Sequence, residues 1–404
     1  MQRVNCNGKL PYVLFSLFYN KKTGKSRARF QVKGDPVMAK AAEVPKSVLS
    51  AFGLEENAKV SAYGNGHIHN TFLVEEEERK FILQKLNTVV FPDYESVMSN
   101  IELVTAFIGK KMADRGKKES GTLTVVPTVD GTSYVALSNK DGTKDIYRVF
   151  VYIDGESRDQ PDALSLQAAG RAFGEFQNLL ADFPVEQLAE TIPHFHDTPK
   201  RYENLRAAID KDAFGRLDSC RDMVALAEKL SWLTPLVTDG IREKTIPLRV
   251  THNDTKLNNL LFRRGTDEVV AVVDLDTVMP GSLLYDFGDS LRCGMATSPE
   301  DGDVIEDIGI NLGYYEAFAC GFLSETGKGM TEKEKELLPV SPLLMTYEVG
   351  IRFLTDYLSG DVYFHTRYEG HNLVRARNQL ILTERMAEAL PEMKRITEEL
   401  IAHL

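Results

Sequence analysis

The chain has 404 residues, 43% of them hydrophobic and 26% charged, and its formal net charge is −11. This balance is typical of a water-soluble globular protein long enough for two lobes or domains. The negative charge argues against nucleic-acid binding, which needs a basic face. Four scattered cysteines without a CxxC pair indicate a reducing compartment and no zinc site. Because no apolar run approaches the length of a membrane span, we expect a cytoplasmic protein that contacts no membrane.

The first 42 residues differ in character from the rest of the chain. An apolar run at 11–19 is followed by a basic segment at 21–29. No small-residue cleavage site follows the apolar run, so the pattern does not indicate a secretory signal. We expect residues 1–42 to be a poorly ordered extension.

Residues 43–155 predict a small, mainly-β lobe. Residues 44–52 favour a helix that ends at Gly53. Residues 59–75 predict two strands around a glycine-rich turn at Gly64, Asn65 and Gly66. Backbone N–H groups of such a turn can bind phosphates, although a plain β-hairpin would have much the same sequence. The remaining pattern predicts a helix over 93–110 and further strands over 80–86, 121–128, 133–138 and 146–153, with a hinge at 151–155.

Residues 156–404 predict a larger, mainly helical lobe. Apolar residues recur with the helical period from Ser165 onward. The predicted helices cover 167–180, 202–209, 218–233, 311–322, 332–337, 343–358 and 373–390. The fold class that we expect is therefore α+β, with a small N-lobe at 43–155 and a large C-lobe at 156–404.

Residues 249–289 contain three spaced acidic positions. His252-x-Asp254 is followed by Asn259, then by Asp274 at the end of an apolar run, then by the segment YDFGD at 285–289. Asp254 can accept a hydroxyl proton, and Asn259 and Asp274 offer the oxygen ligands that Mg²⁺ prefers. A base, an amide and a carboxylate in this order are what Mg²⁺-dependent phosphoryl transfer from ATP requires.

The spacing also explains how the two metal ligands could meet. Residues 260–262 and 269–273 predict two short apolar strands, and 263–268 read as the turn between them. A hairpin of this kind returns Asp274 to the side of Asn259. We expect Asp286, in the third acidic segment, to brace the catalytic loop through hydrogen bonds rather than to contact substrate.

The HxDxxxxN pattern and the strand that ends at Asp274 resemble the catalytic core of the aminoglycoside phosphotransferase and choline kinase superfamily. Further stretches are similar to N-acetylhexosamine 1-kinases, namely 63–68, 195–202, 276–281, 348–364 and 371–379. The resemblance covers roughly residues 45–395 and implies a two-lobed, protein-kinase-like fold with ATP between the lobes.

The resemblance implies a role for each candidate residue. Asp254 orients or deprotonates the acceptor, His252 supports the loop, and Asn259 and Asp274 hold Mg²⁺. ATP would contact the glycine turn and the backbone of the hinge. Either Gln84 or Lys85 faces the phosphates, with Glu102 as the choice of helix partner. The full set of expected cofactor contacts is Gly64, Asn65, Gly66, Gln84, Lys85, Val151 and Ile153.

The acceptor implied by the resemblance is GlcNAc or GalNAc, phosphorylated at its anomeric hydroxyl. The candidate contacts with the sugar are His69, Asp276, Arg352 and Tyr363. Arg352 and Asp356 stand four residues apart, so a structural salt bridge between them is an open alternative.

Two alternative functions remain open at this stage. One is a kinase for another acceptor, such as an aminoglycoside, choline or homoserine. The other is a non-catalytic ATP-binding regulatory protein, which is disfavoured because the base and both metal ligands are present. The sequence does not determine the oligomeric state, and a monomer is favoured.

Overall fold

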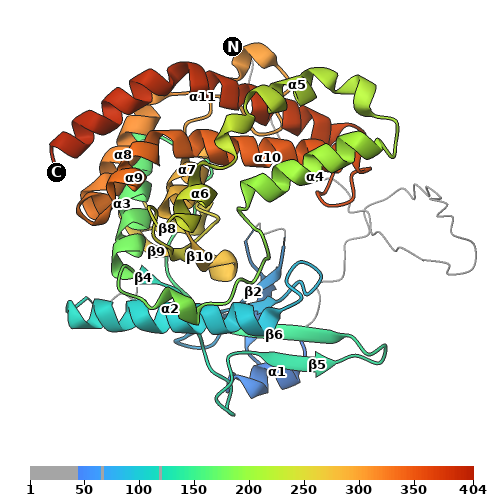
Figure 1. Ribbon diagram of the computed structural model, residues 1–404. Helices are drawn as coiled ribbons and strands as arrows, with labels where there is room; N and C mark the ends of the chain where they lie inside the picture. Colours follow the sequence, from blue (N-terminus) through green and yellow to red (C-terminus); the bar gives the residue numbers. More distant parts are fainter. Residues whose placement is uncertain (1–43, 65–67, 118–120) are drawn as a thin grey trace, which may run out of the picture.

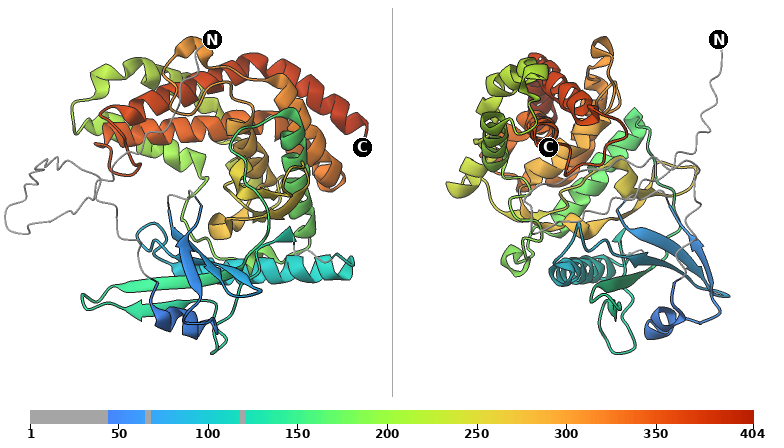
Figure 2. Two further views of the ribbon diagram at one scale, coloured as in Figure 1. Left: turned by 180° about the vertical axis from the view of Figure 1, so that it is seen from behind. Right: turned by 90° about the vertical axis from the view of Figure 1, so that its right-hand side faces the viewer.

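The computed structural model describes residues 44–64, 68–117 and 121–404, so the extension expected at 1–42 lies outside the described residues. Figure 1 shows a sheet-containing N-lobe below a helical C-lobe, and Figure 2 shows the same division from behind and from the side. The prediction of an α+β fold of the protein-kinase-like type is confirmed.

The N-lobe contains a five-stranded antiparallel sheet with the order β1-β2-β3-β6-β5. Its strands are β1 (Lys59–Ala62), β2 (Asn70–Glu75), β3 (Lys80–Lys85), β5 (Val135–Ser138) and β6 (Lys144–Val151). Side chains alternate between the two faces of a strand. Leu83 and Val149 therefore pack with α1 (Lys46–Ala51) on one face, while Ile82 and Phe150 pack with α2 (Tyr94–Asp114) on the other.

The expected strand at 121–128 is wrong as a member of this sheet. Only β4 (Gly121–Thr122) forms there, and it pairs in parallel with β9 of the C-lobe. On one side of β6, β3 pairs along Tyr147–Val151, and on the other side β5 pairs only along Lys144–Tyr147. Residues 124–126 lie along the short remainder of that second edge, with one bridge between Val125 and Phe150 and backbone hydrogen bonds to Val149 and Val151.

The predicted catalytic hairpin is confirmed. It consists of β8 (Leu260–Phe262) and β9 (Val269–Val272), which pair antiparallel, and it is flanked by β7 (Arg249–Thr251) and β10 (Met279–Gly281), which pair with each other. After β9, the N–H of Val273 donates to the carbonyl of Asn259 at 2.9 Å. The hairpin thus returns the chain to the side of Asn259, as the spacing predicted.

Nine α-helices make up most of the described C-lobe. They are α3 (Ala163–Leu179), α4 (Thr198–Lys211), α5 (Arg221–Lys229), α6 (Leu236–Arg242), α7 (Leu283–Gly294), α8 (Leu312–Thr326), α9 (Glu332–Leu337), α10 (Ser341–Leu358) and α11 (His371–Ala402). The stretch Glu332–Leu358 is long and apolar enough to cross a membrane by length and composition. However, 89% of its apolar window is buried inside the protein, as in the core helix of a soluble protein.

Two features of the C-lobe were not predicted. The segment YDFGD lies on α7, which begins after Ser282, whose side chain accepts the N–H of Leu284. Helix α11 continues past Pro391, where the sequence pattern ended at residue 390. Proline removes one helical hydrogen bond, but Met393 and Ile396 beyond it are buried, and their packing holds the last turns in place.

Candidate active site

The catalytic loop between β7 and β8 is anchored on Asp286 of α7. The Asp286 carboxylate, 1% exposed, accepts the N–H of His252 at 3.0 Å, the N–H of Asn253 at 2.8 Å and the amide of Gln177 at 2.6 Å. Burial raises the pKa of Asp286, and the contacts with His252 and Asn253 oppose the rise. These bonds agree with the prediction that Asp286 braces the loop.

His252 is buried beneath the loop, where its ring meets Phe173 and Phe176 edge-on. Its Nδ1 accepts the N–H of Asp254 at 3.3 Å, so Nε2 carries the proton and donates to the carbonyl of Val273 at 2.9 Å. Both ring nitrogens are engaged. His252 therefore links the catalytic loop to the end of β9 and has no free nitrogen for proton transfer.

Asp254 lies beside one cation and one amide. Lys256 Nζ lies 2.6 Å from Oδ1 of Asp254, and the Asn259 amide donates to Oδ2 at 3.1 Å and to the Asp254 carbonyl at 2.7 Å. Desolvation alone would raise the pKa of Asp254, but Lys256 and Asn259 outweigh it and hold the pKa below its ordinary value. The carboxylate is therefore ionised at neutral pH and can accept a proton.

Asp274 follows β9 in the left-handed backbone conformation, with φ +64°. Its side chain is exposed, and no hydrogen bond to its carboxylate is found among the described residues. Desolvation, followed by the charges of the Asp276 and Asp254 carboxylates, raises the pKa of Asp274 to about 6. Among the described residues, Asp274 therefore has no cationic partner and lies near two other carboxylates. Such an arrangement favours the binding of a cation.

The donor chemistry of Asn259 and Asp274 fits Mg²⁺. Because the Asn259 amide nitrogen donates to Asp254, its carbonyl oxygen is left for another partner. Mg²⁺ is usually held by one or two protein oxygens together with substrate phosphates. This agrees with the finding that the described residues contain no group of three or more His, Cys, Asp or Glu side chains arranged for a metal.

Two of the four predicted sugar contacts are buried together at the lobe interface. The side chains of His69 and Asp276 are 6% and 4% exposed, and His69 Nε2 lies 2.6 Å from Asp276 Oδ2. Arg148 of β6 also pairs with Asp276 through the two terminal nitrogens of its guanidinium group. Burial would raise the pKa of Asp276, but Arg148 and His69 hold it well below its usual range. Both oxygens of Asp276 are therefore engaged within the protein.

The strand β3 separates the two candidates for the phosphate contact. Gln84 lies on the face toward α2, where its amide donates to Thr71 at 3.1 Å and its carbonyl accepts from Arg148 at 2.9 Å. Lys85 lies on the opposite face, where its ammonium pairs with Asp145 at 2.7 Å. The two side chains therefore lie on opposite faces of β3, and each has a partner within the N-lobe.

The expected partner on α2 is wrong. Glu102 is exposed on that helix and makes no ion pair within the described part of the chain. The seam of α2 that faces the core instead carries Val97, Met98 and Ile101. Met98 Sδ lies 3.8 Å from the Arg148 guanidinium.

The remaining candidates for nucleotide contacts belong to the turn after β1 and to the hinge after β6. Gly64 has φ +74°, which requires glycine's freedom at the turn; Asn65 and Gly66 lie outside the described residues. At the hinge, the N–H of Val151 donates to Thr124, while no backbone partner of Ile153 is found among the described residues. Asp154 and Gly155 of the hinge also lack a backbone partner among the described residues, so Ile153 is one of three hinge positions whose backbone is available to a base.

Arg352 and Tyr363 lie together at the end of α10. The Arg352 guanidinium lies 5.9 Å from the Tyr363 ring, 5.7 Å from Phe195 and 5.5 Å from Phe364. The alternative salt bridge with Asp356 does not form. The Asp356 carboxylate instead accepts the backbone N–H groups of residues 362–364 and the Asn372 amide.

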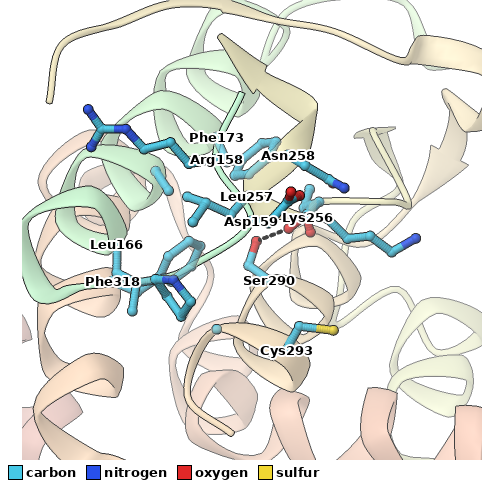
Figure 3. Close-up of a pocket in the computed structure, with 14 residues that line it drawn as sticks. Arg158, Asp159, Leu166, Phe173, Lys256, Leu257, Asn258, Ser290, Cys293 and Phe318 are labelled. Atoms are coloured by element: carbon cyan, nitrogen blue, oxygen red, sulfur yellow. Dashed lines mark hydrogen bonds between the residues drawn. The ribbon is translucent and has the colours of Figure 1, made fainter. Parts of the chain in front are cut away.

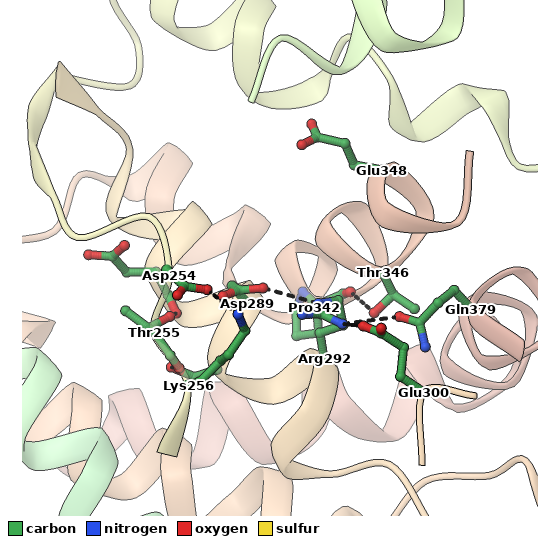
Figure 4. A network of polar contacts seen from close by, with 12 residues as sticks. Asp254, Thr255, Lys256, Asp289, Arg292, Glu300, Pro342, Thr346, Glu348 and Gln379 are labelled. Atoms are coloured by element: carbon green, nitrogen blue, oxygen red, sulfur yellow. Dashed lines mark hydrogen bonds and ion pairs between the residues drawn. The ribbon is translucent and has the colours of Figure 1, made fainter. Parts of the chain in front are cut away.

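A polar network and a cavity lie next to the catalytic loop. Figure 4 shows the network: Asp254 meets Lys256, and Arg292 nearby joins Asp289 at 3.0 Å and Glu300 at 2.8 Å. Figure 3 shows a cavity of about 190 Å³ against residues 255–258, lined also by α3 and α7. Asp254, Asn259 and Asp274 are not among its lining residues, so this cavity is separate from the metal ligands.

Sequence reasoning missed two cations of the site. Lys256 stands two residues after Asp254, within the motif itself, so its position could have been used. Arg148 is the one charged residue in the buried run Ile146–Phe150, and a buried charge needs a partner. The partner could not be named from sequence because Asp276 lies 128 residues away.

The fold is similar to that of several solved kinases. A microcompartment-associated aminopropanol kinase has a TM-score of 0.57 at 17% identity, covering 86% of this chain and 97% of that chain. An aminoglycoside phosphotransferase from Alicyclobacillus acidocaldarius has a TM-score of 0.56 at 13% identity, covering 93% of this chain and 99% of that chain. A Plasmodium vivax ethanolamine kinase has a TM-score of 0.50 at 12% identity, covering 83% of this chain and 86% of that chain. At such identities the similarity shows the fold alone.

A family model described as the phosphotransferase enzyme family (APH) matches residues 59–320. The match begins at β1 and ends in α8, so it contains the N-lobe sheet, the catalytic loop and both metal-ligand candidates. Since it covers more than half of the chain, the protein belongs to the phosphotransferase enzyme family.

Proposed function

We propose that the protein is a kinase that uses ATP and Mg²⁺ to phosphorylate the anomeric hydroxyl of an N-acetylhexosamine, GlcNAc or GalNAc, to the sugar 1-phosphate. The observation that carries the kinase part is the position of Asp254. An ionised carboxylate lies within 3.1 Å of the Asn259 amide, and the end of β9 places Asp274 next to that asparagine.

In this proposal, Asp254 accepts the proton of the acceptor hydroxyl. Its lowered pKa keeps it ionised, so it is ready as an acceptor before the sugar arrives. Lys256 offsets the negative charge that gathers where the acceptor oxygen meets the phosphoryl group. His252 and Asp286 hold the loop so that this oxygen is in line with the transferred group.

Asn259 and Asp274 are the residues that would hold Mg²⁺. When bound, the ion supplies charge neutralisation for the phosphates. Among the described residues, the side-chain carbonyl of Asn259 and the carboxylate of Asp274 have no hydrogen-bond partner, which supports this assignment. The glycine turn at Gly64 and the hinge backbone at Ile153 would position the nucleotide.

The surroundings of Arg352 favour a neutral acceptor over a cationic one. The pKa of Arg201 is lowered by burial and then by the nearby charge of Arg352. Two neighbouring guanidinium groups would repel a polyamine or choline. Sugar hydroxyls and an acetamido carbonyl can accept hydrogen bonds from arginine, and a sugar ring can pack on the exposed Tyr363.

The test is an ADP-release assay over GlcNAc, GalNAc, glucose, galactose, choline, ethanolamine, homoserine and kanamycin. We expect turnover with one or both N-acetylhexosamines. The matched control is 1-deoxy-GlcNAc, which lacks only the proposed acceptor hydroxyl and should not be phosphorylated.

Three outcomes would contradict parts of the proposal. Phosphorylation of the 1-deoxy sugar would exclude the anomeric position. Preference for an amino alcohol or aminoglycoside would replace the acceptor while leaving the kinase assignment intact. Binding of Mg·ATP without turnover of any acceptor in a broad panel would favour the non-catalytic alternative.

A further inference from the structure

Two parts of the N-lobe converge on the carboxylate of Asp276, in the turn that carries Asp274. Arg148, 2% exposed, pairs with both oxygens of Asp276, with 2.9 Å between NH2 and Oδ2. His69, which directly precedes β2, reaches Oδ2 at 2.6 Å. The carboxylate is therefore a junction between the N-lobe sheet and the C-lobe.

The hydrogen bonds fix the orientation of both N-lobe partners. His69 Nδ1 accepts the backbone N–H of Asn87 at 3.0 Å, so Nε2 carries the proton that is donated to Asp276. Arg148 Nε donates to Gln84 at 2.9 Å, and Gln84 donates in turn to Thr71. Strands β2, β3 and β6 are thus connected to one acceptor.

The turn itself connects this junction to the catalytic loop. The hydroxyl of Thr277 donates to the His252 carbonyl at 2.7 Å, and the Asn253 amide donates to the Thr277 carbonyl at 2.9 Å. Asp274, by contrast, has no side-chain hydrogen bond among the described residues. Its position is therefore set by the residues on either side of it, of which Asp276 makes the ion pairs with Arg148 and His69.

We propose that Arg148 is a positioning residue for metal binding: by holding Asp276, it fixes the turn that presents Asp274 and ties that turn to the N-lobe sheet. This inference rests on the proposed function, because it assigns the metal to Asn259 and Asp274. Arg148 is buried on β6, and all three of its guanidinium nitrogens have partners among the described residues. It therefore acts through Asp276 rather than by contacting the nucleotide.

The experiment uses Arg148→Met combined with Asp276→Asn, in the full-length protein. Removing both charges leaves no unpaired buried ion, and asparagine retains an oxygen that can accept the proton of His69. Binding of Mn²⁺, as a spectroscopic substitute for Mg²⁺, is measured by electron paramagnetic resonance with a non-hydrolysable ATP analogue. Loss of residues that orient metal ligands typically weakens metal affinity about 10–100-fold, and we expect that range.

A second set of variants separates positioning from stability. Arg249 and Glu334 form a bidentate pair of the same kind, at 2.7 and 2.8 Å, in the C-lobe. Arg249→Met with Glu334→Gln should lower stability but leave the Mn²⁺ Kd within about twofold, because neither residue contacts the metal turn. Arg148→Lys, which keeps the charge but loses the bidentate geometry, should give an intermediate Kd.

The outcomes distinguish this inference from the proposed function. A folded Arg148→Met/Asp276→Asn protein with a wild-type Mn²⁺ Kd would overturn the inference. Equal weakening in the Arg249→Met/Glu334→Gln control would do the same, since it would show a general effect of stability. If the wild-type protein binds Mn²⁺ with the analogue but phosphorylates no acceptor, the proposed function fails, and the Kd comparison still decides the inference.

Discussion

Replacing Asp274 with asparagine should abolish catalysis and stabilise the protein. The ionised carboxylate lies near Asp276 and Asp254 without a counter-ion, and desolvation followed by these two charges raises its pKa to about 6. Asparagine has nearly the same shape and no charge. Because solvent screens the exposed side chain, we expect a gain of about 1 kcal/mol in the free energy of unfolding, less than the full pKa shift corresponds to.

The pH dependence gives the sign of this effect. A carboxylate with a raised pKa in the folded state destabilises it fully above pH 6, and the penalty disappears as pH falls from 6 toward 4. Urea unfolding should therefore show Asp274→Asn to be more stable than wild type at pH 8, with a smaller difference at pH 4.5. Turnover at pH 8 should fall by at least about a thousandfold, because a metal ligand is lost.

The control for this experiment is Asp303→Asn, which neutralises an exposed carboxylate outside the catalytic loop and the metal turn. Its stability should stay within about 0.5 kcal/mol of wild type at both pH values. A variant at Asp274 that is less stable than wild type at pH 8, or that shows the same gain at both pH values, would refute the electrostatic reasoning.

Three further substitutions test the catalytic loop. Asp254→Ala should lower turnover at least about a thousandfold while Mg·ATP still raises the Tm, and near-normal activity would contradict its role as the base. Lys256→Met should lower kcat/KM about 10–100-fold, with Lys256→Arg retaining most activity, because the cation beside Asp254 is lost. Asp286→Asn should lower the free energy of unfolding by about 2–3 kcal/mol in urea titrations, since an amide group would face backbone donors; an unchanged midpoint would argue against the brace.

Local patterns predicted the hairpin and the helices because each depends on neighbours in sequence. The run from Leu260 to Val273 carries its own strand and turn signals, so the return of Asp274 toward Asn259 could be foreseen. The segment 121–128 has the same apolar character, yet it does not join the N-lobe sheet. Its pairing depended on which edges of β6 were still free, and that is a property of the assembled sheet.

The partner of a buried charge is the part of this site that sequence could least provide. Arg148 stands in an apolar strand, which signals a buried cation but leaves its counter-charge unknown. The sequence predicts Asp276 as a contact for the sugar and gives no sign of its buried partner. Once folded, the two charges neutralise each other across the lobe boundary, while Asp274 has no ion pair among the described residues. An unpaired carboxylate between acidic neighbours costs stability, and that cost is expected where a metal ion must bind.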